Sequence, residues 1–311
     1  MAKAKQTTWF SIAFLVLLWG LSWPIYKVGL QYTPPILFAG LRTLLGGLAL
    51  AAIALPTYKQ LQWRRTWKIY VLSSLLNVVL FFGLQTVGLS YLPAGLFSVL
   101  VYLEPVLVGL IAWKWLGERL TAVKAIGLVL GFLGVAAVSK AGLSGHTSAL
   151  GVVIGIVTAV CWAIGTVYVK KVQDQVNLLW LVATQFVLGG AVMTIIGSGV
   201  ERWSQIHWNG FFILTLLYGM VFGVALSWVI WIGMVHAGEV SRVTSYTFFV
   251  PLISVAVGTV FLHEPITVFL LIGLVLIVLS IYLVNRPSKT TGARTAVQPN
   301  AGQQPTHDNL A

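Results

Sequence analysis

The stretch PAGLFSVLVYLEPVLVGLIAWK, residues 93–114, decides the fold class of this chain. It contains one carboxylate, Glu104, and reaches its first basic residue only at Lys114. About 20 mostly apolar residues in an α-helix cross the roughly 30 Å hydrocarbon core of a bilayer. Similar stretches follow one another along the chain, with short loops between them. The sequence therefore predicts an all-α integral membrane protein.

The composition excludes an ordinary soluble domain. Of the 311 residues, 58% are apolar and only 8% are charged, whereas a soluble domain carries about 25% charged residues. The chain therefore has too few polar side chains to cover the surface of a soluble protein of this size. The single cysteine, Cys161, lies inside an apolar stretch, so neither a disulfide framework nor a cysteine-based metal site is expected.

Prolines and glycines mark most of the breaks between the apolar stretches, for example Pro93 and Pro265. Ten transmembrane helices are expected, at residues 9–30, 35–55, 67–88, 93–114, 121–139, 149–170, 177–198, 210–235, 241–262 and 265–285. The last stretch, 287–311, is polar and rich in Gln, Thr, Pro and Gly, so it is predicted to be a disordered cytoplasmic tail.

The basic residues predict the orientation in the membrane. A cytoplasmic N-terminus places 15 of the 19 Lys and Arg residues in inner segments, three in outer segments and one, Arg42, within a helix. Because Lys and Arg resist translocation, this distribution predicts a multi-pass protein of the cytoplasmic (inner) cell membrane with both termini in the cytoplasm. The same distribution accounts for the net charge of +12, because the basic residues gather on the cytoplasmic side of the lipid bilayer. No nucleic-acid partner is therefore expected.

An internal repeat divides the chain into a first half, 1–142, and a second half, 143–286. A shift of 143 residues aligns Trp19 with Trp162, Lys27 with Lys170, Arg42 with Gln185, and Leu45-Gly46-Gly47 with Leu188-Gly189-Gly190. A shift of 146 residues aligns Pro105 with Pro251, Glu118 with Glu264, Thr121 with Thr267, and Gly127 with Gly273. Each half contains five expected helices, and an odd number inverts the second half relative to the first. Inverted repeats are typical of secondary transporters that work by alternating access.

The order of these motifs resembles the EamA-type members of the drug/metabolite transporter superfamily over roughly residues 9–285. In the first half the matching segments are Leu18-Trp19-Gly20, Lys27, Pro35, Gly40-Leu41-Arg42, Tyr91-Leu92-Pro93-Ala94-Gly95, Leu103-Glu104-Pro105-Val106 and Leu116-Gly117-Glu118-Arg119-Leu120. In the second half they are Trp162-Ala163, Gly189-Gly190, Pro251, Leu262-His263-Glu264-Pro265 and Gly273. The resemblance implies a ten-helix, exporter-type fold with a central cavity, and substrates among amino acids and their derivatives, nucleosides, sugars or drugs. The His263-Glu264 pair departs from the Gly-Glu pair that the family usually has there.

Two charged residues lie deep within expected helices. Arg42 is seven residues into its helix, where a guanidinium costs about 2.5–3.5 kcal/mol on insertion scales and must find a partner. Glu104, the only acidic residue near the middle of a span, is the expected partner. Arg42 is a candidate site for a substrate carboxylate, and Glu104 is a candidate proton or ion coupling site. The alternatives are a structural ion pair, or an Arg42 bonded to helix carbonyl groups.

Two pairs of repeat-related residues are candidate gating elements. Pro105 and Pro251 each remove a backbone donor and kink a helix, which suits either a gate or the curved packing of a bundle. Lys27 and Lys170 end their helices on opposite sides of the membrane. Such lysines ordinarily extend toward the lipid headgroups, and the alternative is a gate or a contact with an anionic substrate.

Deep aromatic and polar side chains are candidates for the lining of a substrate cavity, which would bind by stacking and a few hydrogen bonds. Packing between helices is the alternative for each of them. Besides Arg42, the candidates are Trp19, Trp23, Tyr26, Asn77, Phe81, Gln85, Ser98, Tyr102, Trp162, Thr166, Gln185, Trp228, Thr244, Ser245 and Tyr246.

Glu118 and Glu264 precede expected helices, so each is predicted to cap the N-terminus of a helix as a structural element. Small residues at GxxxG spacing, such as Gly127 and Gly131, allow close helix packing and are compatible with a homo-oligomer.

The motifs of other functional classes are missing from the expected spans. They contain no HExxH, GxSxG or paired aspartates, and the chain has no GxxxxGK[ST] site for ATP. No enzyme activity, cofactor or metal is therefore expected. The sequence predicts a carrier that exports small organic metabolites such as amino acids or their derivatives. The alternatives are efflux of drugs or toxic compounds, and a passive facilitator, exchanger or importer of small metabolites.

Overall fold

The computed structural model describes residues 2–118, 120–143, 148–237, 240, 244, 247, 249–284 and 286, with side chains described from Phe10 onward and not at 135, 138–143, 281 and 284. The predicted tail and the candidates Ser245 and Tyr246 lie outside the described residues. The described ranges consist of helices joined by short loops and turns, without strands.

The first half has long helices at its two ends and shorter ones between them. Its helices are α1 (Ala2–Gly29), α2 (Pro35–Ala54), α3 (Trp63–Ser74), α4 (Phe81–Tyr91), α5 (Ala94–Val101), α6 (Glu104–Trp115) and α7 (Ala122–Leu143). A 3₁₀ segment, Leu55–Leu61, follows α2, and a π-helical turn, Leu75–Leu80, joins α3 to α4. Pro35 occupies the first position of α2, where the missing N–H of proline costs no hydrogen bond.

The second half has a related order of elements. Its helices are α8 (Ala149–Val172), α9 (Leu178–Val200), α10 (Gly210–Tyr218), α11 (Ser227–Ala237), α13 (Phe249–Leu262) and α14 (Val268–Val284). A π-helical turn, Gly219–Leu226, joins α10 to α11, at the place where the first half has Leu75–Leu80. The side chains of Ser148, Asn177 and Asn209 accept hydrogen bonds from the first turns of α8, α9 and α10, which fixes where these helices begin.

Seven helical segments of the described chain are long and apolar enough to cross a membrane. They are Phe10–Gly29, Pro35–Leu61, Trp63–Tyr91, Ala94–Trp115, Ala149–Gln175, Leu178–Val200 and Gly210–Ala237. The other three predicted spans coincide with shorter apolar helices, Ala122–Gly134, Phe249–Leu262 and Val268–Ser280.

The predicted helix 93–114 is interrupted in its middle, between α5 and α6. The backbone of Tyr102 leaves the helical region (φ −77°, ψ 17°), and Leu103 N–H bonds to Leu100 O in a tightened turn. Pro105 explains the break, because proline has no N–H to donate and its ring clashes with the carbonyl of the preceding turn. Glu104 therefore stands at the first position of a new half-helix inside the protein.

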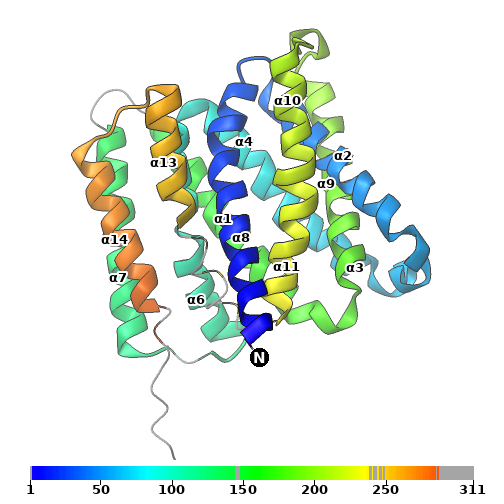
Figure 1. Ribbon diagram of the computed structural model, residues 1–311, viewed down its shortest axis with the longest axis horizontal. Helices are drawn as coiled ribbons and strands as arrows, with labels where there is room; N and C mark the ends of the chain where they lie inside the picture. Colours follow the sequence, from blue (N-terminus) through cyan, green and yellow to red (C-terminus); the bar gives the residue numbers. More distant parts are fainter. Residues whose placement is uncertain are drawn as a thin grey trace, which may run out of the picture.

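The helices form one bundle in which α1 runs through the centre of the view, while α7 and α14 form a pair at one edge (Figure 1). At the other side, α2 packs along α9, and their backbones approach each other closely at two glycines. A Cβ on Gly190 would lie 2.3 Å from the backbone nitrogen of Leu44, and a Cβ on Gly47 would lie 2.5 Å from that of Val187. Only glycine permits this approach.

These contacts are reciprocal between the two halves. Gly190 and Val187 follow Gly47 and Leu44 by the same 143 residues, so each glycine contact maps onto the other. The helices α7 and α14 repeat the pattern with the 146-residue shift. A Cβ on Gly131 would lie 2.8 Å from Ser280 Oγ, and one on Gly134 would lie 2.7 Å from Ile277 Cγ1. A two-fold relation between the halves produces contacts of this kind.

Candidate functional site: a central aromatic cavity

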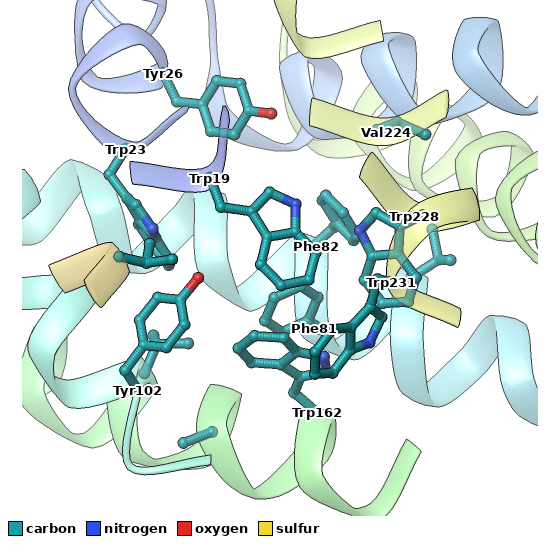
Figure 2. Close-up of a cluster of buried hydrophobic side chains, with 14 of the residues drawn as sticks. Trp19, Trp23, Tyr26, Phe81, Phe82, Tyr102, Trp162, Val224, Trp228 and Trp231 are labelled. Atoms are coloured by element: carbon teal, nitrogen blue, oxygen red, sulfur yellow. The ribbon is translucent and has the colours of Figure 1, made fainter. Parts of the chain in front are cut away.

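Aromatic side chains from both halves meet at the centre of the bundle (Figure 2). The rings of Trp19 and Trp162, which the 143-residue shift aligns, pack edge-to-face with centroids 5.6 Å apart. A residue that contacts its own repeat equivalent lies at the two-fold axis, so this axis passes through the cluster. Trp231 packs against both tryptophans, at 5.2 and 6.0 Å, and Phe81 packs against Trp162 at 4.7 Å.

A small cavity opens within this cluster. It is lined by Trp19, Ser22, Trp23, Tyr26, Phe81, Phe82, Gln85, Tyr102, Trp162, Gly223 and Trp228. About 20 Å³ of it can hold water, which is room for about one molecule. The cavity is therefore closed to an organic solute in this conformation, and the surrounding helices must separate before one can bind.

Eight of the lining residues are candidates from the sequence, and three are not. The eight are Trp19, Trp23, Tyr26, Phe81, Gln85, Tyr102, Trp162 and Trp228. Ser22 lies one turn from Trp19 and Tyr26 on the same helix face, so helical spacing alone would have found it. Gly223 lies in the π-helical turn before α11, where a Cβ would stand 1.8 Å from Tyr26 Oη.

Arg42 lies directly behind the cavity wall and is completely buried. Its Nη2 donates hydrogen bonds to Gln85 Oε1 at 3.1 Å and Thr86 Oγ1 at 2.7 Å. Its Cζ stacks 3.9 Å from the centre of the Tyr26 ring and 4.9 Å from that of Phe82.

The pairing of Arg42 with Glu104 that the sequence suggested is wrong. Glu104 Oε1 instead accepts a hydrogen bond from Thr166 Oγ1 at 3.2 Å, and no carboxylate of the described chain forms an ion pair with Arg42. The two charges belong to different helices, α2 and α6, and bind to different neighbours, α4 and α8. Hydropathy shows that each charge is buried, but it does not show which helices become neighbours.

Glu104 is as deeply buried as Arg42. Its Oε2 has no hydrogen-bond partner among the described residues. The carboxyl group stands at the break between α5 and α6, close to the cavity-lining residue Tyr102. Its one partner, Thr166, follows Trp162 by one turn of α8. A buried carboxyl group with a free oxygen at a helix break can accept a proton or a cation.

The remaining polar candidates lie away from the cavity lining. Ser73 Oγ donates to Gln185 Oε1 at 2.6 Å, and Asn77 Nδ2 donates to Ser73 Oγ at 3.3 Å, which ties α3 to α9. Ser98 Oγ donates to Gly95 O within α5, and Thr244 is buried with its carbonyl accepting from Thr247 Oγ1.

The two candidate gating lysines bind helix ends in place of the expected extension toward headgroups. Lys27 Nζ donates to Leu89 O at 2.6 Å and Leu92 O at 2.9 Å, at the end of α4. Lys170 Nζ donates to the carbonyls of Val235 and His236, at 3.0 and 3.1 Å, at the end of α11. A cation satisfies free carbonyl groups at a helix C-terminus and interacts favourably with its dipole. The related prolines, Pro105 and Pro251, are both buried near the starts of α6 and α13.

Glu264 caps a helix, but not the helix that follows it. Its two oxygens accept hydrogen bonds from Ala94 N at 2.5 Å and Gly95 N at 2.9 Å, at the start of α5 in the other half. Glu201, which the sequence analysis missed, does the same for Ile36 N and Leu37 N at the start of α2. Sequence proximity suggested the following helix, whereas the fold brings a distant one closer.

His263, which stands where the family usually has glycine, has an unusual backbone conformation. Gly117 has a positive φ of 71°, and its repeat equivalent His263 has a φ of 52°. Both residues take the left-handed conformation just before their glutamate. Glycine adopts it without strain, whereas histidine does so at a cost.

Replacing Glu264 by Ala is expected to destabilise the folded protein by about 1–3 kcal/mol, because two N–H groups at the start of α5 lose a charged acceptor. Thermal unfolding of the purified variant in detergent measures the effect. The exposed Asp174, changed to Ala, serves as the control for loss of a carboxylate. Equal melting temperatures for the two variants would contradict a capping role for Glu264.

Comparison with known proteins agrees with this architecture. The profile of the EamA-like transporter family matches residues 7–140 and again residues 149–286. The transporter YvbV of Bacillus subtilis is 51% identical, over 93% of this chain and 95% of its own length. A "Probable amino-acid metabolite efflux pump" of Salmonella typhimurium is 27% identical, over 88% of this chain and 93% of its own.

A crystal structure with 19% sequence identity supports the fold. It aligns with a TM-score of 0.68 over 89% of this chain and 96% of its own chain. The family profile matches twice and covers most of the sequence, and YvbV is identical at about half of its residues. Both findings assign the chain to the same family. The chain is a membrane transporter that belongs to the EamA-like family of the drug/metabolite transporter superfamily.

Proposed function

We propose that this chain is a secondary transporter of ten transmembrane helices, built from two inverted five-helix halves, which exposes the aromatic cavity to one side of the membrane at a time. The closed cavity centred on the repeat-related pair Trp19 and Trp162 is the observation that carries the proposal. A site at the two-fold axis is lined by both halves. When the two halves exchange their conformations, such a site can open first to one side of the membrane and then to the other. The distribution of basic residues supports cytoplasmic termini.

The proposed cargo is a small organic metabolite, such as an amino acid or an amino-acid derivative, moved out of the cell. The relative from Salmonella typhimurium named for amino-acid metabolite efflux supports this substrate class. The cavity chemistry also fits, because aromatic faces receive an apolar side chain while Gln85 and Ser22 offer a few polar contacts. Its predominantly aromatic lining favours efflux of apolar drugs as the second candidate.

The direct test of export compares the growth medium of cells that overproduce the protein with that of matched variants. Trp162→Ala removes the ring at the two-fold axis, and Trp113→Ala removes an exposed tryptophan as the control. We expect one metabolite class to accumulate outside cells with the unaltered protein and with Trp113→Ala, at equal membrane levels. Accumulation at least about tenfold lower with Trp162→Ala is expected, since loss of a central stacking contact weakens binding. No accumulation with the unaltered protein would contradict metabolite export.

A further inference from the structure

The guanidinium of Arg42 is a fully buried charge whose partners are all neutral. Both hydrogen-bond acceptors, Gln85 Oε1 and Thr86 Oγ1, are uncharged, and both bonds come from the same nitrogen, Nη2. The Nε and Nη1 atoms have no partner in the described part of the chain. Stacking on the rings of Tyr26 and Phe82 stabilises a cation but does not neutralise it. A buried charge normally has a counter-ion, and here none is supplied by the described residues.

The fold itself does not require a cation at this position. Gln185, the repeat equivalent of Arg42, is equally buried and neutral. Arg42 lies on α2 and Gln185 on α9, the two helices that contact each other at Gly47 and Gly190. Each glycine makes the same kind of backbone contact with the opposite helix. The second half therefore builds the equivalent structure with an amide. A charge at this position is therefore not required for the packing of α2 against α9.

Three of the side chains that contact Arg42 also line the aromatic cavity. These are Tyr26, Phe82 and Gln85. The Tyr26 ring both lines the cavity and covers one face of the guanidinium. The ring is held by its stacking on the guanidinium and by packing against Phe38 and Gly223. A displacement of Tyr26 when the cavity opens would uncover the free donors of Arg42.

We propose that Arg42 is the anion subsite of the cavity, so that the cargo carries a carboxylate that serves as the missing counter-ion. This inference rests on the proposed transport function and names the chemical class of its substrate. The guanidinium is suited to the task, because its charge is permanent and its N–H groups match the oxygens of a carboxylate. The aromatic rings receive the apolar remainder of the molecule.

The test measures binding of matched acid and amide pairs to the purified full-length protein in lipid nanodiscs. The probes are N-acetyl-L-leucine with N-acetyl-L-leucinamide, and isovalerate with isovaleramide, which differ only in the charged group. Trp19, Trp162 and Trp228 line the cavity, so intrinsic tryptophan fluorescence reports occupancy. The unaltered protein is expected to bind each acid at least about tenfold more tightly than its amide, since a buried charged contact is lost with the amide.

Two variants separate recognition from folding. Arg42→Gln installs the residue that the second half already accommodates, so the protein is expected to fold, which size-exclusion chromatography and thermal unfolding check. It is expected to bind acids and amides with equal affinity. Gln185→Leu alters the equivalent position of the other half and is expected to keep the preference for acids.

Equal binding of acid and amide by the unaltered protein, or no binding of either acid, would overturn the anion subsite. A preference for acids that survives in Arg42→Gln would overturn it as well. Such results leave the transport proposal intact if the growth medium of overproducing cells still accumulates a metabolite. Failure of that accumulation would instead remove the transport proposal, whatever the acids and amides do.

Discussion

Replacing Glu104 by Gln is expected to lower the rate of transport driven by a proton gradient at least about a hundredfold. Exchange of cargo across the membrane is expected to continue. Intramembrane carboxyl groups of this kind commonly take part in proton relays. Glu104 is fully buried at the break between α5 and α6, with Oε2 free of partners among the described residues. Gln has the same shape and can still accept the hydrogen bond from Thr166 through its amide oxygen. The folded structure is therefore retained, whereas the group that binds and releases the proton is lost.

The measurement uses proteoliposomes that contain the purified protein and the metabolite that accumulates in the growth medium. Uptake driven by an imposed pH gradient is compared with exchange of labelled for unlabelled metabolite without a gradient. Asp174→Asn, which alters an exposed carboxylate in the short 3₁₀ turn after α8, is the control. A titratable neighbour of Glu104 in the described part of the chain is Tyr102, and Tyr102→Phe tests whether the phenol contributes.

The outcomes distinguish coupling from binding. Loss of gradient-driven uptake with retained exchange assigns the proton to Glu104. Gradient-driven uptake at the unaltered rate in Glu104→Gln would exclude it as the coupling site. Loss of both activities in a well-folded variant would place Glu104 in cargo binding, which contradicts a pure coupling role.

The membrane environment, the helices and the internal repeat could be predicted from the sequence. The lipid environment follows from the low content of charged residues, 8%, and the helices follow from apolar stretches of about 20 residues. The sequence also supplied most of the aromatic residues of the cavity. The repeat aligns Trp19 with Trp162, and the structure shows that this pair lies close enough to the axis for the two rings to contact each other. Lys27 and Lys170 are aligned as well, yet they bind different helix ends, so alignment alone does not place a residue at the axis.

Contacts between distant helices could not be predicted. The neighbours of Arg42 depend on how α2 and α4 cross, which places Gln85 and Thr86 beside it and leaves Glu104 elsewhere. Glu264 precedes α14 in the chain, yet it caps α5, because the loop folds over the start of that helix. No local pattern encodes either choice, since both depend on the packing of segments far apart in the sequence.

The replacement of Gly190 by Ala is expected to prevent close packing of α2 on α9 and to cause a large loss of stability. The added Cβ would lie 2.3 Å from the backbone nitrogen and 2.6 Å from the Cα of Leu44. A flexible side chain could move away, but a helix backbone can only move as a unit. Overpacking costs about 1–3 kcal/mol where the neighbours can adjust, so a cost of at least about 3 kcal/mol is expected here.

Because the contact is reciprocal, Gly47→Ala is expected to produce nearly the same loss, through the backbone nitrogen of Val187 at 2.5 Å. Thermal unfolding and size-exclusion profiles of both variants in detergent measure the effect. Gly199→Ala is the matched control, since a Cβ at that position meets no atom within 4 Å although it lies on the same helix as Gly190. A Gly190→Ala protein as stable as Gly199→Ala would contradict the backbone contact. A large loss of stability in only one of the two variants, Gly47→Ala or Gly190→Ala, would contradict the two-fold relation. Equivalent contacts in the two halves are expected to be equally sensitive to an added methyl group.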